Sequence, residues 1–420
     1  MSNQFLIHEH ERLDGIEQED AKYADLALIK WDKPLDNYPW GYYASYKIGA
    51  EWINDSSTIL VTTKRTMENI DFLKMYMTCF NSELAITRFS EIYDIKTDQP
   101  SIEAPVALTN VISPLIVVHF LNVVSHIKTL KKGYVHRSEN LKKKKGRLGL
   151  LKNERLNIST KRFDRLFCEY DEYSFDIPEN RIIKKALLAS KVFINKLGSK
   201  DNLYSELRHL LAKDLSLFIS VSSDIQLKEI GIVKRQKLYF EYSEAIRLAK
   251  LVLLQYDYSI KNSSPQKNMI VPFVLDMSLL YELYVYGLLQ KAYPGHIDYQ
   301  FSAMTGVPDF LYRSENFKAI LDTKYIPKYD SQPLDTYVIR QLSADSRDIG
   351  ILKRLGYDDV RETSLIPCIT CVIIYPTEEK GAINPFEKDS LLNLCSLKNG
   401  IKGLVHFYKI EVSLPLIVSN

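Results

Sequence analysis

The stretch VPDFLYRSENFKAILDTK, residues 307–324, decides the fold of the C-terminal part of the chain. Two runs of aromatic and aliphatic residues flank a polar segment, which predicts two antiparallel strands joined by a tight turn. If Ser314–Phe317 form a four-residue turn, Arg313 lies opposite Lys318. We therefore expect a hairpin whose register is fixed by this turn.

Counting back from the turn places Asp309 directly opposite Asp322. Cross-strand Cβ atoms lie roughly 5 Å apart, and two carboxylates at that distance repel unless a cation lies between them. Mg²⁺ (or Mn²⁺) prefers oxygen ligands and leaves positions for water and a phosphate oxygen. Strand alternation turns Lys324 to the same face and Thr323 away. We expect Asp309 and Asp322 to bind the metal, and Lys324 to assist the attacking water or stabilise charge at phosphorus.

The alternative is a surface hairpin with ordinary charges, because Asp-x-Lys is a common triplet. Residues 318–323 instead form an apolar strand that ends in its carboxylate. Glu282 lies in the apolar helical stretch 277–286 and is either a third carboxylate near the metal or a helix-surface glutamate. Gln341, on the helix after the hairpin, either bonds to DNA or a site water or is an exposed helix residue.

The rest of the sequence predicts a multidomain α/β protein, α+β overall, because 420 residues exceed one ordinary core. Strand-forming residues fill 44–63, and apolar residues recur at helical spacing in 178–197 and 238–254. After these come a helix, three strands, a single helix over about 333–355 and two strands, which predict a sandwich around a mixed sheet. We expect a β-containing N-terminal partner-contacting domain (1–165), a helical middle region (166–268) that ends in a linker (261–267), and the sandwich (269–420).

The net charge of only +3 means that any affinity for nucleic acid must come from local clusters of Lys and Arg. The segment 128–152 is strongly basic. A charge run of this kind grips phosphates, contacts a partner protein or is simply a solvated loop. The residues for possible DNA or partner contact are Lys142, Lys143, Lys144, Lys145 and Arg147.

Composition also predicts the compartment. The five cysteines are an odd, scattered set, which favours reduced thiols and a cytoplasmic location. The N-terminal residues lack the features of a signal peptide. Several polar residues interrupt the apolar stretch 106–124, so we expect a buried or partner-facing helix and no membrane partner. No G-x-x-x-x-G-K-[ST] motif occurs, which predicts that this chain alone binds no nucleotide.

The hairpin has the form of a PD-(D/E)XK nuclease site, and further segments resemble the McrC family, the nuclease subunit of 5-methylcytosine restriction systems. Residues 167–172 and 177–184 look like that family's C-x-Y-D-E and P-E-N-R-x-x-K signature. The helix 275–285 and the segment 308–325 are similar to two more of its blocks. The resemblance spans most of the chain from about Gly133 onward and is loose over the first 130 residues.

This resemblance implies a PD-(D/E)XK nuclease sandwich, with Asp309, Asp322 and Lys324 as the nuclease triad and Glu282 and Gln341 as accessory positions. It implies a metal-dependent DNA endonuclease of a modification-dependent restriction system acting on double-stranded DNA. The implied partner is a separate AAA+ GTPase motor, McrB-like, which activates the nuclease and is stimulated by it. Two departures are Thr323, where many relatives carry alanine, and Asp345, where the helix motif often has an aromatic residue.

Two other functions remain open from the sequence. The chain could be a docking and activating module of the motor, with weak or lost nuclease activity. It could also be a free-standing PD-(D/E)XK repair nuclease that needs no motor. The intact Asp309, Asp322 and Lys324 argue against the first, and cleavage by the chain alone would indicate the second.

Overall fold

The protein forms two compact units with mixed helices and sheets, which confirms the predicted multidomain α/β fold class. Unit 1 comprises Met1–Leu115 and Asn262–Asn420, and unit 2 comprises Ile116–Lys261. The structure, a computed structural model, describes residues 3–16, 18–33, 38–67, 69–80, 88–196, 202–226, 240–261, 267–326, 336–357, 368–377 and 384–417. Most of the predicted linker 261–267 lies outside the described residues.

The N-terminal sheet of unit 1 takes one strand from far along the chain. Its order is β1 (Asn3–His8), β5 (Ser57–Thr62), β4 (Lys47–Asn54), β12 (Phe273–Asp276) and β6 (Tyr93–Ile95). β12 is antiparallel to both β4 and β6. Two smaller pairs join β2 (Ile29–Asp32) to β3 (Gly41–Ala44) and β7 (Ile102–Pro105) to β11 (Lys267–Ile270). The N-terminal sheet thus includes residues from the predicted 269–420 domain, because the strand pairing is non-local.

Helix α8 (Met277–Ala292) begins directly after β12 and is buried along most of its length. The Asp276 carboxylate caps it by accepting hydrogen bonds from the Ser278 and Leu279 amides at 3.0 and 3.1 Å. Helix α1 (Phe72–Cys79) packs against α8. The backbones meet at Gly287, where an added Cβ would lie 2.0 Å from the Thr78 carbonyl oxygen.

The C-terminal sheet is mixed, as predicted. Its order is β13 (Ile297–Tyr299), β14 (Phe310–Arg313), β15 (Lys318–Thr323), β16 (Thr370–Thr377) and β17 (Phe407–Ser413). The β13–β14 and β14–β15 pairs are antiparallel, whereas β16 is parallel to both β15 and β17. Arg313 pairs with Lys318, which confirms the predicted register.

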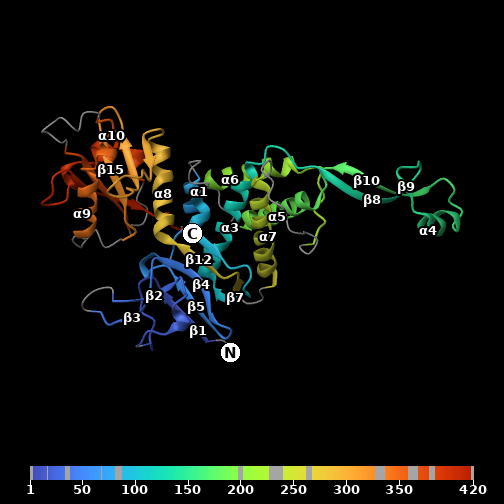
Figure 1. The fold of residues 1–420 in the computed structure, drawn as a ribbon, viewed down its shortest axis with the longest axis horizontal. Helices are drawn as coiled ribbons and strands as arrows, with labels where there is room; N and C mark the ends of the chain where they lie inside the picture. Colours follow the sequence, from blue (N-terminus) through green and yellow to red (C-terminus); the bar gives the residue numbers. More distant parts are fainter. Residues whose placement is uncertain are drawn as a thin grey trace. The chain divides into compact units, whose positions relative to one another are not determined.

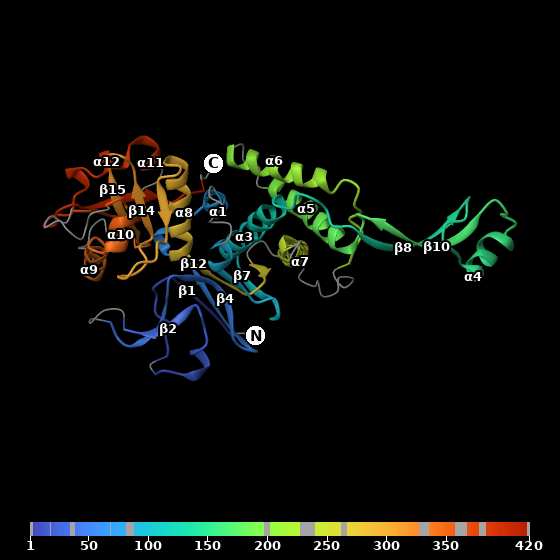
Figure 2. The ribbon, with the colours of Figure 1, turned by 45° about the horizontal axis from the view of Figure 1, so that its top comes forward.

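Helices cover this sheet on two sides: α8 lies on one side, and α9 (Thr336–Asp345) and α10 (Ile349–Arg354) lie on the other (Figure 1, Figure 2). The prediction of a single helix over 333–355 was wrong. The chain breaks after α9, and the Asp348 carboxylate caps α10 by accepting from the Gly350 amide at 2.7 Å. Two short helices, α11 (Pro385–Lys388) and α12 (Leu391–Leu394), lie between β16 and β17 in sequence.

Unit 2 is built on helices. They are the later part of α3 (Val106–Ser125), α5 (Pro178–Lys196), α6 (Asn202–Leu217) and α7 (Phe240–Lys261). α5 packs against both α6 and α7. By length and composition α3 could cross a membrane, but 67% of it is buried within the protein, as in a core helix.

An arm with a three-stranded sheet, residues 133–174, forms the other part of unit 2 (Figure 1). Strands β8 (Gly133–Leu141) and β10 (Leu166–Ser174) pair along their whole length, and β9 (Arg147–Leu148) and α4 (Leu150–Asn153) lie at the far end. The predicted boundary at 165/166 would separate β8 from β10. Most of the basic segment 128–152 and the strand β10 that follows it therefore belong to one arm.

The close contact between α8 and α1 predicts that Gly287→Ala destabilises the protein by about 3 kcal/mol, because the new methyl group has to displace backbone. Chemical denaturation measures this change. Lys291→Ala on the same helix, which removes only a surface ion pair with Glu387, should change stability little. Equal effects of the two substitutions would contradict the packing described for Gly287.

Candidate active site

The end of the β14–β15 ladder brings the predicted acids together. Pairing runs from Arg313 and Lys318 to Phe310 and Leu321, so Asp309 immediately precedes β14 and Asp322 follows the last pair. Asp322 is only 1% exposed. It therefore lies, as a carboxylate, at the end of a strand whose neighbouring residues are apolar and buried.

Lys324 is the cationic partner of this carboxylate. Its Nζ lies 2.6 Å from Asp322 Oδ2, and its side chain is 24% exposed. The Lys324 amide donates to the Ile374 carbonyl at 2.9 Å, which fixes the backbone against β16. Burial is the largest single effect and lowers the pKa of Lys324, but contact with Asp322 and the charges of Asp309 and Glu282 together raise the pKa above its ordinary value. The amine stays protonated at neutral pH.

Two acids of the site titrate near neutrality. Burial first, and then the Asp309 charge, raise the pKa of Asp322 to about 7. Glu282, which is 8% exposed on α8, has a pKa raised to about 7 by burial and by the same Asp309 charge. The Gln300 side-chain amide donates to Glu282 Oε1 at 2.8 Å. The structure therefore groups Glu282 with the predicted acids.

Asp309 is held by Thr323, which corrects one expectation from the sequence. The Thr323 amide and hydroxyl donate to Asp309 Oδ2 at 2.6 and 2.5 Å. Thr323 is therefore not turned away from the acids, because Asp309 lies beyond the end of the ladder and reaches across to it. Burial raises the pKa of Asp309, and the two hydrogen bonds from Thr323 oppose that rise.

Asp345, which sequence reasoning treated as a departure, also belongs to the cluster. It is 1% exposed at the end of α9, and the Thr305 hydroxyl donates to its Oδ1 at 2.7 Å. Its Oδ2 is buried and has no hydrogen-bond partner among the described residues. The Asp345 charge contributes to the raised pKa of both Asp309 and Asp322. A buried acid in a helix next to the hairpin was the signal that could have found it.

Gln341 lies on α9 but is not brought into the cluster by any hydrogen bond within the described residues. Its helix packs onto the sheet through Val338 and Leu342, which share a core with Leu311 and Ile320. The helix thus supports the strands that carry the acids. The predicted accessory role of Gln341 stays a prediction.

The chemistry of the cluster fits a hard divalent cation. All its acidic ligands are carboxylates, whose pKa values are raised first by burial and then by neighbouring negative charge, and a cation would offset that charge. Among the described residues, no three His, Cys, Asp or Glu side chains are grouped closely enough to hold a metal. The pair Asp309 and Asp322, expected from the sequence, would hold Mg²⁺ with water in the other positions.

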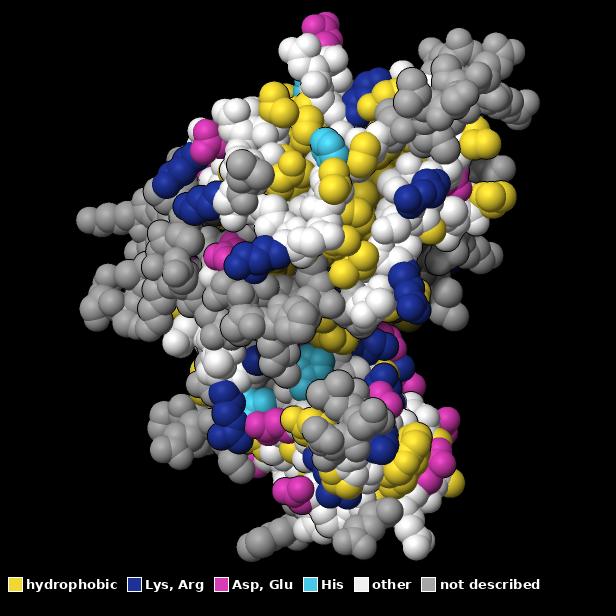
Figure 3. All heavy atoms as spheres, turned by 90° about the vertical axis from the view of Figure 1, so that its left-hand side faces the viewer, with side chains coloured by type: hydrophobic (Ala, Val, Ile, Leu, Met, Phe, Trp, Pro, Cys, Tyr) yellow, Lys and Arg dark blue, Asp and Glu magenta, His cyan; other side chains and the backbone are white. Residues whose placement is uncertain are grey.

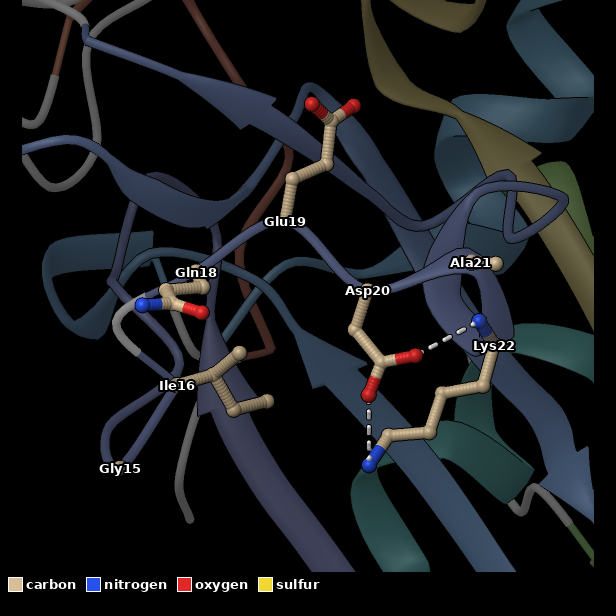
Figure 4. Close-up of a pocket in the computed structure, with 7 residues that line it drawn as sticks. All are labelled: Gly15, Ile16, Gln18, Glu19, Asp20, Ala21 and Lys22. Carbon is tan, nitrogen blue, oxygen red and sulfur yellow. Dashed lines mark hydrogen bonds and ion pairs between the residues drawn. The ribbon is translucent and has the colours of Figure 1, made fainter.

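A surface hollow elsewhere in unit 1 is not part of this cluster. It is lined by Gly15, Ile16, Gln18, Glu19, Asp20, Ala21 and Lys22 (Figure 4). The Asp20 carboxylate pairs with Lys22 Nζ at 3.0 Å and accepts from the Lys22 amide at 3.0 Å. Asp20 is therefore already paired, and we assign the hollow no chemistry.

Residues 57–344 match the family model described as the McrBC 5-methylcytosine restriction system component. The chain belongs to this family. The match includes Glu282, Asp309, Asp322 and Lys324, and it confirms the family predicted from the sequence. No curated protein sequence matches the chain.

Two solved structures to which the chain is similar come from Thermococcus gammatolerans. One is a half-complex from a tetradecameric assembly of McrB AAA+ hexamers with bound McrC, with 15% identity and a TM-score of 0.39, covering 99% of this chain and 95% of that chain. The other is a McrBC complex with 13% identity and a TM-score of 0.31, covering 69% of this chain and 88% of that chain.

The raised pKa of Glu282 predicts a pH-dependent stability effect in metal-free buffer. Its pKa rises from an ordinary 4.5 to about 7 on folding, so the folded state loses stability as the pH rises between these two values. Above pH 7 the accumulated loss stays constant. Glu282→Gln should therefore stabilise the protein by on the order of 2 kcal/mol at pH 8 and little at pH 4.

Thermal or urea unfolding with EDTA at both pH values measures this difference. Glu315→Gln is the matched control, because Glu315 is exposed in the hairpin turn. A Glu282→Gln effect that is the same at pH 4 and pH 8 would contradict the buried, charge-crowded site.

Proposed function

We propose that this chain is the endonuclease subunit of a McrBC-like modification-dependent restriction system. It hydrolyses phosphodiesters of double-stranded DNA with Mg²⁺ or Mn²⁺. The observation that carries the proposal is the contact of Lys324 Nζ with Asp322 at 2.6 Å, beside Asp309 and Glu282. An ordinary surface hairpin has no physical reason to bury these charges together.

The residues divide the chemistry between them. A bound divalent ion would supply Lewis acidity at the phosphate and lower the pKa of water. Asp309 and Asp322 hold that ion, and Thr323 orients Asp309 through its amide and hydroxyl. Lys324 is protonated and partly exposed, so it can donate to the attacking water or to the charged phosphate oxygen. Glu282 can hold or release a proton near neutral pH.

The DNA path in this proposal uses local basic groups. Lys and Arg side chains on one face of the molecule lie scattered among apolar and acidic ones (Figure 3). The net charge of +3 agrees with this distribution. Affinity for DNA therefore has to come from small sets of contacts and from a partner that holds the duplex.

The end of the arm is the part of unit 2 that we propose contacts the partner. Its apolar side chains are unusually exposed: Leu150 is 75%, Leu151 81% and Phe163 76% exposed. Exposed apolar groups that lie together mark protein interaction sites in soluble proteins. The same end of the arm carries exposed basic residues that form no ion pair with described residues: Lys142, Lys143, Lys144 and Arg147. Lys145 instead pairs with Glu172 at 3.2 Å.

The proposed partner is a McrB-like AAA+ GTPase. Membership in a family of restriction system components supports a multi-subunit machine, and the absence of a P-loop motif supports a separate nucleotide-hydrolysing subunit. We propose that the system works in the cytoplasm, which agrees with the five free cysteines.

Cleavage of methylated and unmethylated plasmid DNA with Mg²⁺, with and without the neighbouring motor protein and GTP, tests the function. We expect cutting that needs both motor and nucleotide. Asp309→Asn and Lys324→Met should each lower the cleavage rate by on the order of 10²–10⁴-fold, since the first removes a metal ligand and the second a cation that acts on the water or the phosphate. Glu315→Gln should cut like the unaltered chain.

The same assay separates the alternatives. Cutting by the chain alone would indicate a free-standing nuclease. No cutting, with the partner's GTPase still stimulated, would indicate a docking and activating module. Full cutting by Asp309→Asn would contradict the assigned site.

The arm gives a separate prediction. Leu150→Asp with Leu151→Asp should abolish stimulation of the partner's GTPase, because charges replace the apolar contact surface. Ile219→Asp is the matched control, since Ile219 is an apolar residue of unit 2 that is also 81% exposed. GTP hydrolysis measured against chain concentration reads out both. Loss of stimulation in Lys142→Glu with Lys143→Glu, but not in the leucine variant, would move the contact to the basic run.

A further inference from the structure

Tyr325, the residue directly after Lys324, is held by the N-terminal part of unit 1. It is 3% exposed, and its ring packs against Tyr46, between β3 and β4, with centroids 6.3 Å apart. On another side it packs against Tyr281 of α8 at 5.9 Å. The residue that follows the proposed catalytic lysine is therefore enclosed by both the N-terminal sheet and the helix that carries Glu282.

Lys64 makes two contacts to this same residue. It lies just after β5, and its Nζ donates to the Tyr325 carbonyl oxygen at 3.2 Å. The same Nζ lies 4.1 Å from the centroid of the Tyr325 ring, within the range of a cation–π interaction. One side chain thus restrains both the backbone and the ring of Tyr325.

Glu9, just after β1, completes the contact from the other side. It is 4% exposed, and its Oε2 accepts from the Lys64 amide at 3.2 Å and from the Tyr325 hydroxyl at 3.3 Å. These bonds connect β1 and β5 to the end of β15, which lies more than 250 residues further along the sequence. The donors on Lys64 and Tyr325 offset part of the cost of burying this carboxylate, whose Oε1 has no hydrogen-bond partner among the described residues.

We infer that Lys64 is a positioning residue for the nuclease reaction: from the N-terminal domain it fixes the Tyr325 backbone and so sets where the Lys324 ammonium stands against Asp322. This inference rests on the proposed function. The position of the Lys324 ammonium depends on the Lys324 backbone, which is tied to Ile374 on one side and to Lys64 through Tyr325 on the other. Misplacement of a catalytic group by about 1 Å costs on the order of 10²-fold in rate.

The test compares Lys64→Met, Lys64→Arg and Arg65→Met in the full chain with its motor. Lys64→Met keeps the length of the side chain but removes the donor and the charge. We expect it to lower the single-turnover cleavage rate by about 10–100-fold at saturating DNA with KM unchanged. Lys64→Arg should recover most of the rate. Arg65→Met is the matched control, because Arg65 is the neighbouring cationic residue, is 72% exposed and pairs at the surface with Glu11.

A second readout does not depend on cutting. Hydrogen exchange at the Lys324 and Tyr325 amides should become faster in Lys64→Met and stay unchanged in Arg65→Met. Normal exchange and normal cutting by Lys64→Met would overturn the inference. Failure of the unaltered chain to cut DNA, with exchange still faster in Lys64→Met, would overturn the proposed function and leave the contact intact. A rise in KM alone in Lys64→Met would overturn the positioning inference, because it would assign Lys64 to DNA binding.

Discussion

The burial of Asp322 is the constraint on which the rest of the site depends. A carboxylate that is 1% exposed at the end of an apolar strand is costly unless charge and hydrogen bonds compensate it. Lys324 provides that compensation at 2.6 Å, yet Asp309, Glu282 and Asp345 add further negative charge around it. The folded chain therefore has an excess of buried carboxylates over cationic groups around Asp322, and a bound divalent cation would offset their negative charge.

This imbalance is sustained because the site is anchored on three sides. β12 joins the N-terminal sheet and continues into α8, so the helix that carries Glu282 starts from a strand held between β4 and β6. α9 packs onto the sheet and brings Asp345. The N-terminal strands reach the other end of the site through Tyr325. The N-terminal domain is thus part of the scaffold of the site as well as a candidate partner-contacting domain.

Local patterns predicted the hairpin register, because two apolar runs joined by a tight turn allow only one pairing of the strands. The family was predicted from separate sequence blocks. The orientation of Thr323 was predicted wrongly, because strand alternation holds only inside the ladder and Asp309 lies beyond its end. The place of Asp345 and the insertion of β12 into the N-terminal sheet depend on contacts between distant segments, which periodicity does not encode. The sequence analysis predicted only a basic segment where the arm lies. Its strands were missed because the many charged residues break the apolar pattern by which strands are recognised. The catalytic roles themselves stay predictions.

A divalent-cation site at Asp309 and Asp322 is tested most directly by a crystal structure of the chain with Mn²⁺, in which anomalous scattering locates the ion. We expect one strong peak between the carboxylates of Asp309 and Asp322, with the Lys324 ammonium displaced from Asp322 toward solvent or a bound phosphate. A peak at another set of residues, or no peak at Mn²⁺ concentrations that support cleavage, would contradict it.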